Sequence, residues 1–261
     1  MSIYARLKIA IGEQNWFAVG LEMIIVMGSL LLAFQIDRWY EANQEQKRES
    51  DYLQRLKENL ETDRQNIQSR IDFYSEVKTY GELAISHYEK RSNPEVDNWD
   101  ILVAYFQASQ IWPILLTSDT YDELKSAGEL DLLRSVQLRE FLARYYGDQY
   151  TNYENTIGIM PEYRQEIRGE VPFFLQNEIW AYCHDTAEVT NIQFLVDCEQ
   201  PEGIAERDID RAVQQIEYGN YIRNLRFWIS NISVGLDILE NQKIHGERVI
   251  AMISELQDEE S

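Results

Sequence analysis

The stretch FAVGLEMIIVMGSLLLAFQIDRWYE, residues 17–41, decides how the chain is organised. Residues 17–36 carry a single charge, that of Glu22. An α-helix rises about 1.5 Å per residue, so this run covers ~30 Å, the thickness of the hydrocarbon core of a bilayer. Trp16 precedes the run and Trp39 and Tyr40 follow it, as expected for aromatic residues at two membrane–water interfaces. The stretch predicts a transmembrane helix over residues 16–40, with these three aromatics as interface anchors.

A cleaved signal peptide is the alternative interpretation of this segment. Its apolar region would be shorter, about 7 to 15 residues, and would end in a small-x-small cleavage site. The run here is longer, and it ends in FQIDRWYE, which contains no such site. We therefore expect an uncleaved anchor. Before it, Ile3, Leu7 and Ile11 form one stripe, which predicts an amphipathic N-terminus over residues 1–15 that lies on the membrane surface.

Four residues interrupt the apolar character of the predicted span: Glu22, Gly28, Ser29 and Gln35. Glu22 lies roughly 9 Å along the helix from Trp16 and would be a proton or ion site in one interpretation. In the other, which we favour, it reaches the headgroups or hydrogen-bonds a neighbouring helix. Gly28 and Ser29 permit close approach of a second helix. We expect all four residues to make helix–helix contacts in the membrane.

The two cysteines bear on the location of the soluble part. Cys183 and Cys198 bracket CHDTAEVTNIQFLVDC, a stretch with no clear helical period. Cysteines that close a short irregular loop favour a disulfide and hence an oxidising compartment, whereas the alternative is two unrelated thiols in a cytosolic domain. The basic residues on the two flanks of the span are too balanced to decide the orientation. We expect a single-pass protein of a bacterial inner membrane, with a cytoplasmic N-terminus and a periplasmic domain.

Beyond the span, the chain has the apolar period of long helices. No helix breaker occurs from Glu41 to Gly81, and apolar residues recur there at three- and four-residue steps, with coiled-coil character and Asp63 as the one gap. A similar pattern follows Asp208. We expect an all-α fold. A single N-terminal transmembrane helix continues into a long stalk helix, which packs antiparallel with a long C-terminal helix in a helical-bundle soluble domain over residues 41–257.

Shorter segments fill in the rest of this domain. WDILVAYFQASQIW, residues 99–112, predicts a buried helix that Pro113 ends. Ser118 and Gly128 are the expected caps of the next helix, and Ser135 that of the one after. The segment 169–205 contains prolines, glycines and both cysteines, so we expect it to be irregular. The tail at 258–261 is expected to fray.

The composition argues against several functions. The 45 acidic and 24 basic residues give a formal net charge of −21, so a nucleic-acid partner is disfavoured. The three histidines, His87, His184 and His245, lie in no metal or catalytic motif. We expect no catalytic, cofactor-binding or metal-ligating residue, and no cofactor. Four tyrosines at helical spacing predict a packing surface for a neighbouring chain: Tyr145, Tyr146, Tyr150 and Tyr153.

Two stretches, residues 21–63 and 118–148, resemble an uncharacterised family of bacterial single-span, membrane-anchored helical proteins. The family has a Glu entering the span and an "ALQINNWNE"-like exit, here AFQIDRWYE, followed by spaced leucines. It later has a helix pair with a "YxeLkssGxLxlI…LrxxLxxYY" pattern. Ser29 departs from it, standing where a glycine is expected, with Gly28 one place early. The matching positions are Glu22, Ala33, Gln35, Ile36, Trp39, Glu41, Leu53, Leu56, Leu60, Tyr121, Leu124, Ser126, Gly128, Leu130, Leu138, Leu142, Tyr145 and Tyr146.

The resemblance implies the architecture and no activity, so the functional expectation comes from the residues. We expect a membrane-anchored, non-enzymatic accessory or scaffold protein whose partners are the lipid bilayer and either itself or other subunits of a membrane complex. A membrane-anchored sensor or effector that binds a small ligand in its helical domain is the alternative. A homo-oligomeric pore that uses Glu22 is a weaker third hypothesis.

Overall fold

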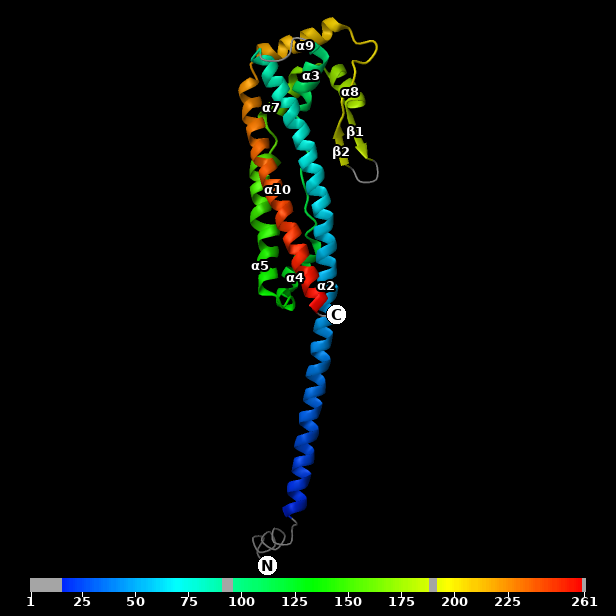
Figure 1. Cartoon of the computed structure of the whole chain (residues 1–261), viewed down its shortest axis with the longest axis vertical. Coiled ribbons are helices and arrows are strands. Elements are labelled where there is room, and N and C mark those ends of the chain that lie inside the picture. Colours follow the sequence, from blue (N-terminus) through cyan, green and yellow to red (C-terminus); the bar gives the residue numbers. More distant parts are fainter. Residues whose placement is uncertain (1–15, 91–95, 188–191, 260–261) are drawn as a thin grey trace, which may run out of the picture. The chain divides into compact units, whose positions relative to one another are not determined.

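The long helix predicted at the N-terminus is α2, Trp16–Tyr88, in the computed structural model, which describes residues 16–90, 96–187 and 192–259 (Figure 1). The helix passes through Gly81 without a break. The chain divides into two compact units, Met1–Tyr52 (unit 1) and Leu53–Ser261 (unit 2). The predicted amphipathic segment 1–15 lies outside the described residues. About 80% of the structure is helical, so the all-α fold class is confirmed.

Within unit 2, the later part of α2 lies alongside α10, Ile222–Glu259, as Figure 1 shows. Three hydrogen bonds mark the pairing: Gln257 to Gln54 (3.4 Å), Lys243 to Gln68 (2.6 Å) and Arg226 to Glu89 (2.6 Å). Residue numbers rise along one helix while they fall along the other, so the predicted antiparallel pairing is confirmed. A Cβ added to Gly81 would lie 2.1 Å from Ile229 Cδ1, so the glycine is what allows this close approach.

The single C-terminal helix predicted from Asp208 is wrong, because two helices occupy that region. They are α9, Glu206–Gly219, and α10, and Asn220 separates them with a left-handed φ of 56°. Asparagine tolerates that conformation and ends helices in this way. Asp258 and Glu259, part of the predicted frayed tail, are still helical.

The buried helix α3, Asn98–Gln107, begins where the side chain of Asp97 accepts a hydrogen bond from the backbone N–H of Asp100 at 2.9 Å. The helix ends before Pro113, so the prediction that this proline stops it is wrong. The chain that follows carries backbone N–H groups that need other partners. Two buried tyrosine hydroxyls accept these bonds: Tyr74 from Trp112 at 3.1 Å, and Tyr153 from Ile114 at 3.2 Å.

Three short helices come next: α4, Asp119–Ala127, the 3₁₀ turn η1, Leu130–Leu132, and α5, Val136–Arg144. Gly128 has a φ of 72° at the predicted C-cap, and Ser135 accepts a bond from Leu138 N–H at the predicted N-cap. Ser118 stands at an N-cap position but makes no capping bond, because its hydroxyl donates to Asp122 at 2.6 Å.

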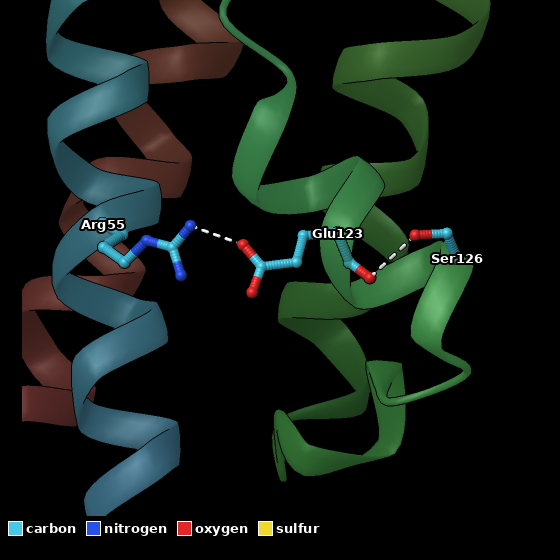
Figure 2. Close-up of polar contacts among 3 residues, drawn as sticks. All are labelled: Arg55, Glu123 and Ser126. Atoms are coloured by element: carbon cyan, nitrogen blue, oxygen red, sulfur yellow. Dashed lines mark hydrogen bonds and ion pairs between the residues drawn. The ribbon is translucent and has the colours of Figure 1, made fainter.

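An ion pair connects α4 to the early part of α2 in unit 2. Figure 2 shows Arg55 reaching Glu123 at 2.5 Å, while the hydroxyl of Ser126 donates to the Glu123 carbonyl at 3.1 Å. Both charged side chains are about half exposed, at 47% and 46%. An exposed pair of this kind contributes only ~0.2–1 kcal/mol, so it orients α4 more than it stabilises the domain.

After α5 the helix widens twice: the π turns η2, Tyr145–Gln149, and η3, Glu154–Gly158, flank the short α6, Tyr150–Tyr153. Tyr145 and Tyr153 are buried, with 0% and 3% of their surface exposed. Tyr146 stacks on Tyr121 with a ring separation of 5.0 Å. The prediction that these tyrosines form a surface for a neighbouring chain is therefore wrong; the side chain of Tyr150 lies outside the described part.

The segment expected to be irregular is mostly regular. Residues 169–205 contain the end of α7, Glu162–Glu170, then α8, Phe173–Tyr182, and a hairpin of β1, His184–Ala187, and β2, Ile192–Leu195. The strands pair antiparallel, with His184 opposite Leu195 and Ala187 opposite Ile192. Two four-residue strands are too short to show their period of two clearly, which is why the sequence pattern did not indicate them.

Candidate functional site

The apolar segment of α2 in unit 1 is exposed on every side. The consecutive residues 23–27 point in directions about 100° apart, so together they sample the whole circumference of the helix. Each of the large apolar side chains from Leu21 to Tyr40 is between 50% and 69% exposed: Leu21, Met23, Ile24, Ile25, Val26, Met27, Leu30, Leu31, Leu32, Phe34, Ile36, Trp39 and Tyr40. By length and composition, α2 is apolar enough to cross a membrane.

The residues predicted to contact a second helix lie along this same segment. Glu22, Ser29 and Gln35 are exposed, and a Cβ added to Gly28 would meet nothing within 4 Å. The Ser29 hydroxyl donates to the carbonyl of Val26 at 2.9 Å, within its own helix. A helix–helix role for these residues stays a prediction.

The predicted interface anchors lie on α2 as well. Trp39 and Tyr40 are exposed, and the Tyr40 hydroxyl accepts a hydrogen bond from Gln44 at 2.7 Å. Trp16 is the first residue of the helix, and its side chain lies outside the described part. Their depth in a bilayer stays a prediction.

Cys183 and Cys198, the pair for which the sequence favours a disulfide, are joined by one in the structure. Helix α3 holds the backbone at both cysteines. Gln107 donates to the Cys183 carbonyl at 2.7 Å, and the indole N–H of Trp99 donates to the Cys198 carbonyl at 3.0 Å. The disulfide therefore closes the hairpin at the point where it is attached to the core.

Replacing both cysteines with serine is expected to lower the free energy of unfolding of unit 2 by about 3 kcal/mol, because the 15-residue separation sets the chain entropy that the disulfide removes from the unfolded state. Urea unfolding of the full chain in detergent, followed by far-UV circular dichroism, measures the change. A reductant should lower the free energy of unfolding of the native protein by a similar amount. It should leave that of the Cys183→Ser/Cys198→Ser variant unchanged. A variant as stable as the native protein would contradict the prediction.

A cavity of about 750 Å³ lies between α2, α3 and the chain after β2. Tyr80 and Trp99 supply aromatic wall, and the Tyr80 hydroxyl donates to Asp197 at 3.3 Å. Burial, together with the charges of Asp97 and Asp197, raises the pKa of Asp100 above its ordinary range. The cavity is acidic, with four lining carboxylates: Asp97, Asp100, Asp197 and Glu199.

A fully buried carboxylate of unit 2 lies elsewhere, on α2. Asp63 is 0% exposed and accepts hydrogen bonds from the backbone N–H of Thr117 at 2.7 Å and from the Tyr145 hydroxyl at 3.2 Å. Burial raises its pKa, and these two hydrogen bonds partly oppose the shift. Asp63, which interrupts the apolar pattern of the sequence, therefore occupies a position in the core. An acidic residue on an otherwise apolar stripe was the one signal for it.

Two arginines of α7 form a half-buried cationic pair that sequence analysis missed. Arg164 donates to the Ser109 carbonyl at 2.8 Å, and Arg168 donates to the Ser109 hydroxyl at 3.1 Å and lies 3.6 Å from the ring centre of Phe106. Neither forms an ion pair within the described residues. Burial and then the charge of Arg164 lower the pKa of Arg168 to about 9. The sequence offered no signal, because their partners come from the end of α3 and the irregular chain that follows it.

The three histidines make contacts within the domain. His87 lies 3.2 Å from Glu217, His184 lies 3.3 Å from Gln193, and His245 donates to the Phe141 carbonyl at 3.1 Å. In the part of the chain that the structure describes, no three His, Cys, Asp or Glu side chains come together in a way that could hold a metal ion.

Comparison with known proteins adds no relationship: no family model, no curated protein and no solved structure matches this chain.

Proposed function

We propose that this protein is a membrane-anchored, non-enzymatic accessory protein that assembles with itself or with other subunits of a membrane complex. The observation that supports the proposal is the all-round exposure of the apolar side chains on α2 between Leu21 and Tyr40. A large apolar side chain gains about 1.5–3 kcal/mol on leaving water, so more than ten of them strongly favour a lipid surrounding. Unit 2, by contrast, buries its own apolar core.

The proposed membrane is the bacterial inner membrane, crossed once, with the N-terminus in the cytoplasm and unit 2 in the periplasm. The disulfide between Cys183 and Cys198 supports this orientation, because such bonds persist in oxidising compartments. Protease added to intact spheroplasts tests it. Digestion of unit 2 from outside supports the periplasmic orientation, and protection of unit 2 until the membrane is broken would contradict it.

Placing arginine at Ile25 and Leu31 together is expected to move the chain out of the membrane fraction. Each substitution costs about 3–4 kcal/mol near the centre of a span, so the pair costs ~6–8 kcal/mol. The measurement is the fraction of full chain that stays with membranes after alkaline carbonate extraction. Leu115→Arg is the matched control, because Leu115 is 76% exposed but belongs to unit 2. Retention of the double variant at the native level would refute the anchor.

The assembly itself is tested by extraction from native membranes in mild detergent, followed by size-exclusion chromatography and mass spectrometry of the peak. Other proteins in a stable peak would support a role as a subunit of a larger complex. A peak that contains several copies of this chain alone would support self-assembly. A monomeric peak under the mildest extraction conditions, together with no cross-linked assembly in intact membranes, would contradict both forms of the proposal.

A membrane-anchored ligand sensor is the second candidate, favoured by the acidic cavity beside Tyr80 and Trp99. Carboxylates and aromatic faces both attract cations, so a small organic cation is the fitting ligand class. Spermidine is a suitable probe in a thermal-shift titration of the native protein and of Asp100→Asn. A shift in melting temperature that weakens in the variant would favour the sensor, and no shift would argue against it.

A further inference from the structure

Helix α10 carries a second stripe of residues in addition to the one that it buries in the core. Its members follow one another at alternating four- and three-residue steps, the spacing of the contact positions in a coiled coil. They contain no acidic residue, although they belong to a chain of net charge −21. We call this set the outer seam: Phe227, Asn231, Val234, Ile238, Asn241, His245 and Arg248.

Four residues of the outer seam are exposed, and the other three are half-buried against their own chain: Asn231, Ile238 and His245. Phe227 and Val234 are 68% and 51% exposed. Two cavities lie along it. The one of about 290 Å³ has η3 and the residues that follow it as its opposite wall, and the one of about 440 Å³ has α6. Ile159 and Met160 form an apolar edge of the smaller cavity, and their side chains are 65% and 53% exposed. The seam therefore has the form of a shallow groove that accepts a helix.

We propose that the outer seam packs against the outer seam of a second copy of this chain, with the two α10 helices parallel and in register. The proposal rests on the proposed function. Two chains anchored in one membrane both enter unit 2 at Leu53 from the membrane side, so these two points of entry should lie at the same end of the pair. Parallel pairing meets that need, and an antiparallel pair does not.

Charge favours this occupant, and two-fold symmetry is compatible with it. Two copies of a strongly acidic chain repel each other over most of their surface, so contact is least opposed along a seam without acidic residues. In a parallel, in-register pair each residue meets its own equivalent, which is one of the arrangements that a two-fold interface allows. Val234 and Ile238 then pack against apolar partners. Asn231, which makes no hydrogen bond among the described residues, pairs with Asn231 of the second copy, the arrangement by which asparagine sets register in coiled coils.

The small contact area of the seam limits how strongly two copies can associate. Twenty-one helical steps cover ~32 Å, and a contact strip ~10 Å wide gives ~300 Å² per copy. That is below the ~800 Å² per partner of stable complexes, so the pair is weak between free molecules. Confinement of both chains to one bilayer raises their effective concentration and compensates for the small area. We expect the pair in membranes and its loss on dilution in detergent.

Site-specific cross-linking of the full chain in vesicles tests the proposal. Both native cysteines are in the disulfide, so a single introduced cysteine is the only free thiol. With a short bis-maleimide, Phe227→Cys and Asn241→Cys should each give a cross-linked dimer at least fivefold above Glu240→Cys, whose exposed side chain lies outside the seam on the same helix. An antiparallel pair would separate equivalent Phe227 positions by some 25 Å or more and give no product there.

A second substitution separates the seam from accidental collisions. Val234→Asp adds a like charge on both sides of the contact and should reduce the Asn241→Cys product to the Glu240→Cys level. Its melting temperature should match the native one, because Val234 is exposed. Equal yields at all three cysteines, or no dimer at any of them, would overturn the proposal. Neither result affects the carbonate-extraction test of the anchor, so failure of the seam and failure of the proposed function are distinguishable.

Discussion

Replacing Asp63 with leucine is expected to lower the free energy of unfolding of unit 2 by about 2–6 kcal/mol. The leucine removes the acceptor of two buried donors, the Thr117 backbone N–H and the Tyr145 hydroxyl. Each buried donor left without a partner costs ~1–3 kcal/mol, and the apolar side chain supplies neither bond. Urea unfolding of the full chain in detergent measures the loss. A leucine variant as stable as the native protein would show that these bonds are unimportant.

Asp63→Asn is the matched control, and it predicts a pH effect of definite sign. Burial raises the pKa of Asp63 in the folded protein, so the folded state holds this proton to a higher pH than the unfolded chain does. The stability that this site contributes is therefore fully present below the unfolded value, near ~3.9, and is lost as the pH rises through the raised folded value. Asparagine retains an acceptor oxygen and does not titrate.

The free energy of unfolding of Asp63→Asn should consequently fall less than that of the native protein between mildly acidic and neutral pH. The same urea measurement at several pH values in this range tests the sign. Parallel pH profiles for the two proteins would exclude Asp63 as the source of the dependence. A steeper profile for the variant would contradict the direction of the pKa shift.

Trp228→Ala is expected to cost about 3–5 kcal/mol of unfolding free energy, the range for removing a large aromatic side chain from a core. Trp228 is 2% exposed, and its indole N–H donates to the Ala108 carbonyl at 3.0 Å. It therefore fastens α10 to the chain that follows α3. The change is measured by urea unfolding followed by far-UV circular dichroism, which does not depend on the deleted fluorophore.

Two further substitutions divide this effect into its parts. Trp228→Phe keeps most of the apolar volume and loses the donor, so it should cost clearly less than alanine does. Tyr218→Ala removes an aromatic side chain that is 94% exposed and should change stability by no more than about 0.5 kcal/mol. Equal losses at Tyr218 and Trp228 would mean that burial does not govern the effect.

The long helices were predictable because their apolar residues repeat over many turns. The pairing of α2 with α10 follows from two such stripes, and the part of α2 within unit 2 also contacts the segment from α4 to η2. Arg55 contacts Glu123, and Asp63 contacts Tyr145. The pairing of Cys183 with Cys198 involves the only two cysteines in the chain. In each case a pattern long enough, or a residue type rare enough, left few alternatives.

The errors have local causes. Helix α3 ends at Gln107, and hydroxyls from Tyr74 and Tyr153 accept backbone N–H groups of the chain beyond it. These partners are distant in the sequence, so no neighbouring residue indicates them. The tyrosines after α5 were placed on the surface because their spacing was measured against a regular α-helix. In the structure, η2 and η3 alter that spacing, and Tyr145 and Tyr153 both face the core.

The two π turns also bear on how this chain should be aligned with any relative. A π turn holds about one residue more than an α turn, so η2 and η3 together resemble two single-residue insertions in one helical segment. A relative with a regular helix here would be two residues shorter between α5 and α7. An ungapped alignment would then match Tyr153 with a residue on a different face. Gaps placed inside this segment would be the correct ones.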